Sequence, residues 1–191
     1  PAVITLSVSA LLFAGATYLA SERHVGDLHA GAPELRPEAR FNKDITEITK
    51  RYAVTTDVLV VIAETGATGG INPCRSTYTV EAQDNLHWYL ENIPGITKVI
   101  SLSSVAKRAL SGYAEGNLKW TYLPHDERAL AFATSVVDPT TGLLNEACSI
   151  LPIYVFTEDH KATTISTVID SIEKYNENFR SSDETFTFRY M

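Results

Sequence analysis

Cysteine and histidine are the residue types in this chain with the clearest chemistry, and the chain has two cysteines, Cys74 and Cys148. The pattern places Cys74 in the loop after a first strand and Cys148 just before a third strand, so contact between them is plausible but not required. Joined as a disulfide, they would stabilise the fold by about 4 to 5 kcal/mol in the chain-entropy model. An exported domain favours that bond and a cytosolic one does not; the alternative is two unrelated thiols. We expect a disulfide, because the apolar opening run of the chain indicates export.

The five histidines are not spaced for a metal centre. The segment HVGDLH (24–29) places two imidazoles and Asp27 in a Gly-rich loop, whereas metal sites usually need an ordered scaffold and a third or fourth ligand. His87 lies beside Trp88 in a predicted helix and is expected to pack in the core or at its rim. Asp159 precedes another predicted helix, where a carboxylate is better explained as an N-cap than as a catalytic base. We expect no metal site and no cofactor.

The remaining polar residues show no signature of a nucleophile or of a phosphate site. The chain has no Gly-x-Ser-x-Gly elbow, and its Ser, His and Asp residues form no recognisable catalytic set. The stretch GATGG (66–70) lacks the Gly-Lys-Ser/Thr of a phosphate loop and the spaced glycines of a dinucleotide fingerprint. In EGNLKW (115–120) the tryptophan is expected to anchor a turn, with a place on a groove surface as the alternative. These patterns indicate a binding or structural module and not an enzyme.

The opening run of the chain has no charged side chain up to residue 21, and Glu22 and Arg23 then follow at once. A helix rises about 1.5 Å per residue, so some 20 apolar residues match a hydrocarbon core of roughly 30 Å. The apolar residues are spread all round this helix, whereas a surface helix of a soluble domain shows one apolar stripe. Tyr18 lies near the end, where aromatic side chains favour the membrane interface. We expect residues 2–20 to span a membrane; a trimmed signal peptide and a buried core helix are the alternatives.

The rest of the pattern predicts an α+β fold. Short β-branched runs between turn residues indicate strands, and longer stretches with apolar residues at three- and four-residue steps indicate helices. We expect strands at 57–64, 96–102, 149–158 and 184–190, and helices at 79–93 (capped by Thr79) and 160–179. This order is that of a ferredoxin-like βαββαβ fold, in which two helices cover one face of a four-stranded antiparallel sheet.

We expect three parts along the chain. Residues 1–21 form the transmembrane helix, residues 22–56 a Gly- and Pro-rich linker with a short helix, and residues 57–191 the ferredoxin-like domain. An insertion at about 104–148 separates the second and third strands. It holds two candidate helices, near 103–113 and 126–136.

The charge of the chain argues against one class of partner. The net charge is −7 and the isoelectric point about 5.2, and the basic residues are scattered singly or in pairs such as Lys50-Arg51. A nucleic-acid surface would show a basic stripe, and a polybasic membrane segment a run of basic residues. We expect no nucleic-acid partner.

Several stretches together carry a family resemblance. They are GDLHAGAPELRPEARFNKD (26–44), TTDVLVVI (55–62), LENIPGITKVISL (90–102), EGNLKW (115–120) and CSILPIYVFTEDHKATTI (148–165). In these stretches the chain resembles the large extracytoplasmic loop of RND-superfamily exporters, in the branch of predicted hydrophobe or lipid exporters related to the MMPL proteins. The Pro-Gly that ends a helix before a β-branched strand (94–102) is a moderately specific hallmark of the superfamily, and GDLHAGAPELRP with EGNLKW is more specific.

This resemblance implies a place in a larger protein. In that family each half of the transporter has one span, a large periplasmic loop of ferredoxin-like porter subdomains, and five further spans. The implied location is the bacterial inner (plasma) membrane, with the bulk of this segment in the periplasm. The implied partners are the remaining spans and second porter loop of the same proton-driven transporter, the lipid bilayer, and a hydrophobic or lipid-like substrate. Related assemblies occur as monomers, dimers or trimers, and no residue is assigned to substrate contact.

Two other function classes fit parts of the sequence. A self-contained, membrane-anchored periplasmic binding or adaptor module explains the same span and fold. A secreted hydrolase would need a clustered acid–base pair in a pocket, and the sequence places none.

Overall fold

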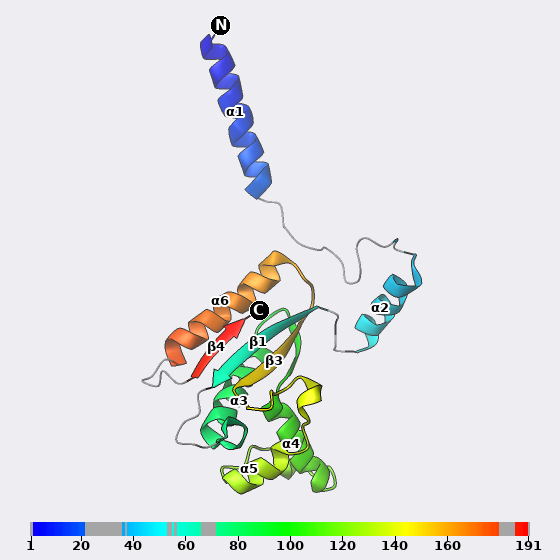
Figure 1. Cartoon of the computed structure of the whole chain (residues 1–191). Helices are drawn as coiled ribbons and strands as arrows, with labels where there is room; N and C mark the ends of the chain where they lie inside the picture. The colour runs from blue at the N-terminus through cyan, green and yellow to red at the C-terminus, as the bar shows by residue number, and fades with distance from the viewer. Residues whose placement is uncertain are drawn as a thin grey trace.

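The computed structural model describes residues 2–21, 36, 38–52, 55, 57–65, 72–179 and 186–190, and these form a mixed α+β chain (Figure 1). The predicted α+β class is therefore confirmed. In order, the elements are α1 (Ala2–Ser21), α2 (Arg40–Arg51), β1 (Val58–Thr65), η1 (Pro73–Arg75), α3 (Thr77–Glu91), β2 (Ile96–Ile100), α4 (Leu102–Tyr113), η2 (Leu118–Trp120), α5 (Glu127–Thr134), η3 (Pro139–Thr141), β3 (Ile150–Thr157), α6 (Ala162–Phe179) and β4 (Phe186–Tyr190).

Helix α1 is apolar along its whole length, and every one of its described side chains is exposed. The polar residues near its end bond to the helix backbone: Thr17 Oγ1 donates to the Phe13 carbonyl at 2.8 Å, and Ser21 Oγ donates to the Tyr18 carbonyl at 2.7 Å. Such bonds satisfy a hydroxyl in an apolar medium. By length and composition, α1 is able to cross a membrane.

The strands form one antiparallel sheet in the order β2-β3-β1-β4. The central strands β1 and β3 pair over most of their length, with Val61 opposite Ile153. Strand β4 pairs with β1, and β2 pairs with β3 after an irregularity between Ile96 and Lys98. The first and third strands therefore lie in the middle, and the second and fourth form the edges.

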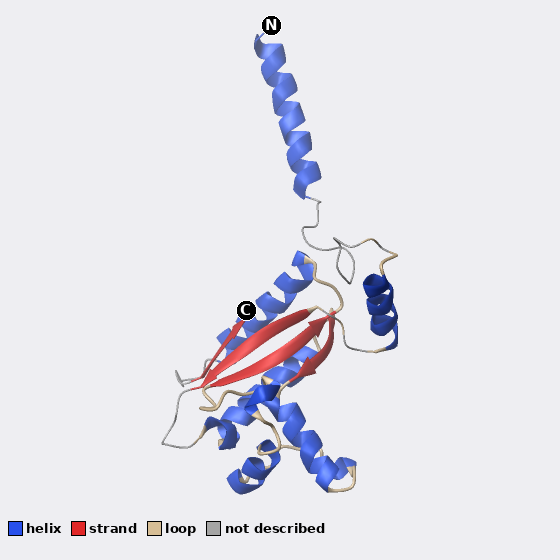
Figure 2. Ribbon diagram, turned by 45° about the vertical axis from the view of Figure 1, so that its right-hand side comes forward, coloured by secondary structure: helices blue, strands red, loops and turns tan. Residues whose placement is uncertain are grey.

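One face of this sheet is packed and the other is open (Figure 2). Alternate residues of a strand point to opposite faces, and the β-branched pattern of β1 and β3 follows that period. On the packed face, Tyr89 of α3 contacts Tyr175 of α6 with ring centres 5.0 Å apart. The core there joins the sheet to these two helices through Val61, Ala63, Leu151, Ile153, Val155, Leu86, Leu90, Val168 and Ile172.

The insertion between β2 and β3 is largely helical, with α4 packed against α3 and α5 packed against α4. Its last part reaches the open side of the sheet, where Tyr154 Oη donates to the carbonyl of Gly142 at 3.1 Å. Gly142 has a φ of 76°, a left-handed conformation that glycine adopts without a steric cost.

Two predicted caps are wrong in detail, although all helix and strand ends lie within one or two residues of the predicted positions. Helix α3 begins at Thr77 and not at Thr79; its N-cap is Ser76, whose Oγ accepts from the Thr79 backbone N–H at 3.4 Å. The carboxylate of Asp159 accepts from Lys161 N at 3.2 Å and from Thr164 Oγ1 at 2.5 Å, but α6 itself begins only at Ala162. A serine one turn earlier thus supplies the cap of α3, because only its side chain reaches the third free N–H.

Candidate functional site

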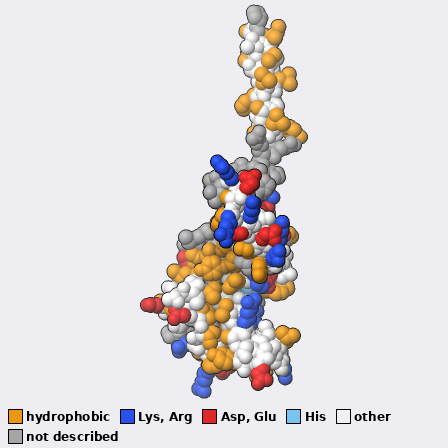
Figure 3. All heavy atoms as spheres, turned by 90° about the vertical axis from the view of Figure 1, so that its right-hand side faces the viewer, with side chains coloured by type: hydrophobic (Ala, Val, Ile, Leu, Met, Phe, Trp, Pro, Cys, Tyr) orange, Lys and Arg blue, Asp and Glu red, His pale blue; other side chains and the backbone are white. Residues whose placement is uncertain are grey.

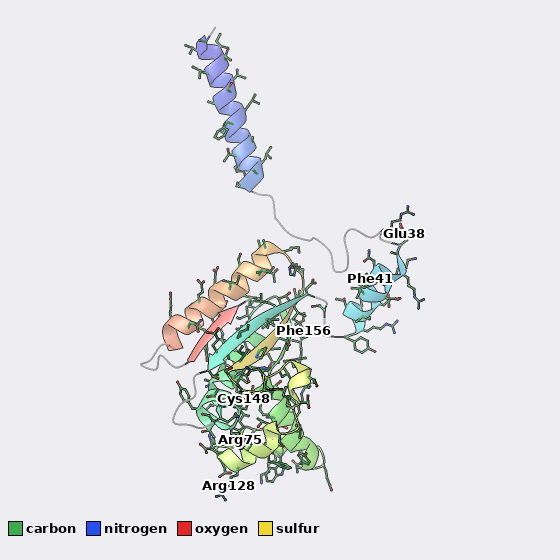
Figure 4. All side chains as sticks on the ribbon, viewed as in Figure 1. Glu38, Phe41, Arg75, Arg128, Cys148 and Phe156 are labelled. Atoms are coloured by element: carbon green, nitrogen blue, oxygen red, sulfur yellow. A yellow bond between two sulfur atoms is a disulfide. The ribbon has the colours of Figure 1, made fainter. Side chains whose placement is uncertain are left out.

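Cys74 and Cys148 are joined by a disulfide, with their Cα atoms 5.6 Å apart. Both are buried. Cys148 lies just before the first residue of β3, whereas Phe156 lies near the last residue of that strand (Figure 4). The surrounding backbone is held on both sides: Cys74 N donates to Asn72 Oδ1 at 2.9 Å, and Thr65 Oγ1 donates to the Cys148 carbonyl at 2.9 Å. The disulfide therefore ties η1, which follows β1, to the end of the insertion just before β3.

Among the described residues, no group of three or more His, Cys, Asp and Glu side chains is placed to hold a metal ion. HVGDLH (24–29) and GATGG (66–70) both lie outside the residues that the structure describes.

A cavity of about 360 Å³ lies between α3, α4 and the segment that leads into α5. Its floor is apolar, since Val80 and Leu130 are fully buried there. Its walls are mainly polar and come from α3 (Thr77, Glu81, Asp84, Asn85), from α4 (Lys107) and from the insertion (Thr121, Tyr122, Leu123, Pro124, His125). The volume is within the range of small-molecule sites, but the lining is more polar than is usual for them.

An ion pair forms part of the cavity wall. Lys107 Nζ lies 2.6 Å from Asp84 Oδ1, and both side chains are about a quarter exposed. The pair joins α4 to α3 and largely neutralises its own charge, so that Glu81 leaves an acidic excess in the wall. The arrangement suits a small molecule with an apolar body and a polar or cationic end.

A chain of buried polar side chains lies behind this wall and connects α3 to the start of α4. His87 Nδ1 is 2.9 Å from Ser101 Oγ, and Ser101 Oγ is 2.8 Å from Ser103 Oγ. Ser103 N donates to Gln83 Oε1 at 3.1 Å. On the other side of the ring, His87 Nε2 lies 3.4 Å from Glu91 Oε1. Sequence inspection gives no sign of this chain beyond the expectation that His87 is packed.

The order Ser101, His87, Glu91 is that of a nucleophile with its base and orienting acid, but the burial of Ser101 prevents that use. Ser101 is fully buried, and its Oγ also accepts from Ser104 N at 3.3 Å as the N-cap of α4. A nucleophile must reach its substrate. These side chains therefore fix the position of α4 against α3, and burial lowers the pKa of His87, with Glu91 and Asp84 opposing that shift.

Exposed aromatic pairs surround the outer end of the insertion. Trp120 is 44% exposed and lies 6.2 Å from Tyr122 between ring centres, and Tyr113 lies 4.7 Å from Phe132. The tryptophan of EGNLKW lies in the turn η2, with its ring tilted against that of Tyr122. Tyr122 lines the cavity, whereas Trp120 does not.

Comparison of the chain with protein-family models, curated proteins and solved structures found no match. The resemblance to RND exporters therefore rests on the quoted stretches of sequence alone.

Proposed function

We propose that this chain is an extracytoplasmic porter segment, with its preceding membrane span, of an RND-type exporter for hydrophobic or lipid-like molecules. The observation that carries the proposal is the pairing of α1, an apolar helix with no buried residue, with a disulfide-bonded α+β domain. Disulfides persist in exported compartments, and an apolar helix of this length fits a bilayer. The sequence resemblance adds the family and the substrate class.

The proposal includes a ferredoxin-like fold for the domain. Its support is the strand order β2-β3-β1-β4, all antiparallel, with α3 and α6 on one face. In that fold the first and third strands are central and two helices cover one face, with the insertion placed after β2. A porter subdomain of this kind offers its open sheet face and its loops to neighbouring parts of the transporter.

In this role the segment lines a substrate path and does not supply the driving force. Ionisable side chains inside a membrane span usually mark proton or ion pathways, and α1 has none. The proton relay of the exporter would lie in its other spans, and the second porter loop would face this one. The bulk of this segment would lie in the periplasm, outside the bacterial inner membrane.

A topology experiment tests this placement. Alkaline phosphatase, which is active only after export, is fused after Phe179, and green fluorescent protein, which fluoresces only in the cytoplasm, is fused at the same position in a second, matched fusion protein. We expect phosphatase activity without fluorescence, with both fusions in the membrane fraction. Fluorescence with inactive phosphatase would contradict the proposal.

The cavity supports a second candidate function, a self-contained membrane-anchored binding module. It is built within one domain, from α3, α4 and the insertion, and has the size of a small-molecule site. In a complete binding module, the exported domain alone would bind its ligand and transport would not depend on it. Loss of export of lipid-like compounds on deletion of the gene favours the transporter instead.

A further inference from the structure

Helix α2 presents an apolar stripe that nothing in the described residues covers. Phe41, Ile45 and Ile48 recur at three- and four-residue steps, which places them on one side of α2, and Tyr52 follows directly as the C-cap residue with an extended backbone. Phe41 is 50% exposed, Ile48 47% and Tyr52 66%, and no residue of α2 is buried. A helix of this length is marginal on its own in water, so its apolar stripe needs a partner surface.

The rest of α2 is strongly charged. It carries four basic and two acidic side chains, and the acidic ones are paired: Arg40 Nε lies 3.4 Å from Asp44, and Glu47 lies 3.6 Å from Lys50 and 3.3 Å from Arg51. The helix is thus positive in a chain whose net charge is −7. The four basic residues lie within this one helix, and Figure 3 shows blue side chains interspersed with red ones on this part of the surface. This contrast favours an anionic surface as the partner.

The position of α2 in the chain brings a lipid surface within reach. Residues 22–39 connect α1 to α2, and a chain of that length spans at most about 60 Å. If α1 crosses the bilayer, as the proposed function requires, α2 is tethered within that distance of the same bilayer.

We infer that α2 lies on the membrane surface, with its apolar stripe among the lipid headgroups and its basic residues near anionic lipids. This inference rests on the membrane placement in the proposed function. Amphipathic helices with basic residues bind in this way, with the apolar side buried to a depth of about 5–10 Å. Tyr52, at the end of the stripe, has the amphipathic ring that favours the interface.

The competing partner is the open face of the protein's own sheet. That face carries half-buried apolar residues of the central strands, among them Val60, Ile62 and Phe156. It would cover the stripe of α2 equally well, and because the chain outside α2 is acidic, charge does not separate the two partners; the tether to α1 favours the lipid surface. Fluorescence quenching separates the two partners.

Single cysteines labelled with an environment-sensitive fluorophore distinguish these surroundings in the full chain. The native cysteines are already joined, so the label is attached without reducing agent to Ile48→Cys, to Lys43→Cys on the opposite side of α2, and to Leu11→Cys in α1. Each variant is reconstituted in phosphatidylcholine vesicles with and without phosphatidylglycerol. Quenching is measured with a lipid-borne nitroxide and with aqueous iodide, and folding is checked by the protease resistance of the domain.

We expect lipid quenching to be about threefold stronger at position 48 than at position 43, and iodide quenching to be stronger at position 43. Without phosphatidylglycerol, lipid quenching at position 48 should decrease. If the label at position 11 is quenched by lipid but the label at position 48 is shielded from both quenchers, α2 packs on protein. This result overturns the inference but leaves the membrane placement of α1 intact. Iodide quenching at position 48 equal to that at position 43 also overturns it. Absence of lipid quenching at position 11 contradicts the proposed function and removes this inference with it.

Discussion

His87 is buried on α3, with one ring nitrogen 2.9 Å from Ser101 Oγ and the other 3.4 Å from Glu91. A buried imidazole is easier to keep neutral than charged, which is why burial lowers the pKa of His87 below its ordinary value near 6.5. Glu91 and Asp84 attract the charged ring, while Lys107 and Lys98 repel it. The net effect links the packing of α3 on α4 to pH.

The stability of the domain should therefore fall in mild acid. Above pH 6.5 the ring is neutral in both the folded and the unfolded chain, and no cost arises. Below that pH the unfolded chain takes up a proton that the folded one resists, so the free energy of unfolding decreases until the pH reaches the lowered pKa of the folded state. Urea unfolding of the wild type between about pH 8 and pH 5, compared with His87→Gln, measures this. If the free energy of unfolding of His87→Gln depends on pH as that of the wild type does, His87 is not the cause of the pH dependence.

Ser101 holds both the N-terminus of α4 and the ring of His87. Ser101→Ala removes the cap and leaves buried polar atoms without a partner, so we expect a loss of about 1–3 kcal/mol in the free energy of unfolding. Ser135→Ala is the control, because Ser135 Oγ bonds locally to the Phe132 carbonyl at an exposed site. Equal effects of the two substitutions in urea unfolding would argue against the network.

Among the elements, the periodicity of the sequence was enough to predict the strands and the helices. The alternation in β3 and the apolar spacing in α6 are local properties, and local properties can be read without knowledge of the fold. The cavity and the buried polar chain are different in kind. The polar chain depends on contact between Gln83 of α3 and Ser103 of α4, and the cavity on side chains from α3, α4 and the insertion. No local sequence pattern predicts contacts of this kind between separate elements.

The disulfide is the strongest single link between elements. Replacing both cysteines, as Cys74→Ser with Cys148→Ser, opens a loop of 74 residues and should lower the free energy of unfolding by about 4 kcal/mol. Urea unfolding of the double variant beside the wild type, with and without reducing agent, measures this loss. The free energy of unfolding of the double variant should not change with reducing agent. If that of the wild type also does not change, the result contradicts the disulfide.

The contact of the insertion with the open side of the sheet can be tested at a glycine. Gly142 and Gly116 have nearly the same φ, 76° and 78°, so alanine is similarly strained at both. Only at Gly142 would the new Cβ meet another group, Tyr154 Oη at 2.7 Å, whereas the space at Gly116 is open. Gly142→Ala should therefore cost about 1 kcal/mol more than Gly116→Ala through the displaced Tyr154 hydrogen bond. Equal midpoints of thermal unfolding would mean that the insertion does not depend on this contact.

The whole molecule combines an apolar helix, a charged amphipathic helix and a disulfide-bonded domain, and the proposed function places all three at one membrane. Each part has an exposed apolar surface that needs a partner: the whole of α1, the stripe of α2 and the open sheet face of the domain. A transporter supplies partners for all three, namely neighbouring spans, the bilayer surface and a second porter loop. An isolated module leaves the open sheet face without a partner.

The coding DNA on both sides of this segment tests the exporter proposal most directly. We predict further hydrophobic spans in the same reading frame after residue 191, with ionisable residues inside some of them, since the driving force of transport requires such groups. A stop codon close after residue 191 would contradict the exporter proposal and would leave the membrane-anchored binding module as the function to pursue.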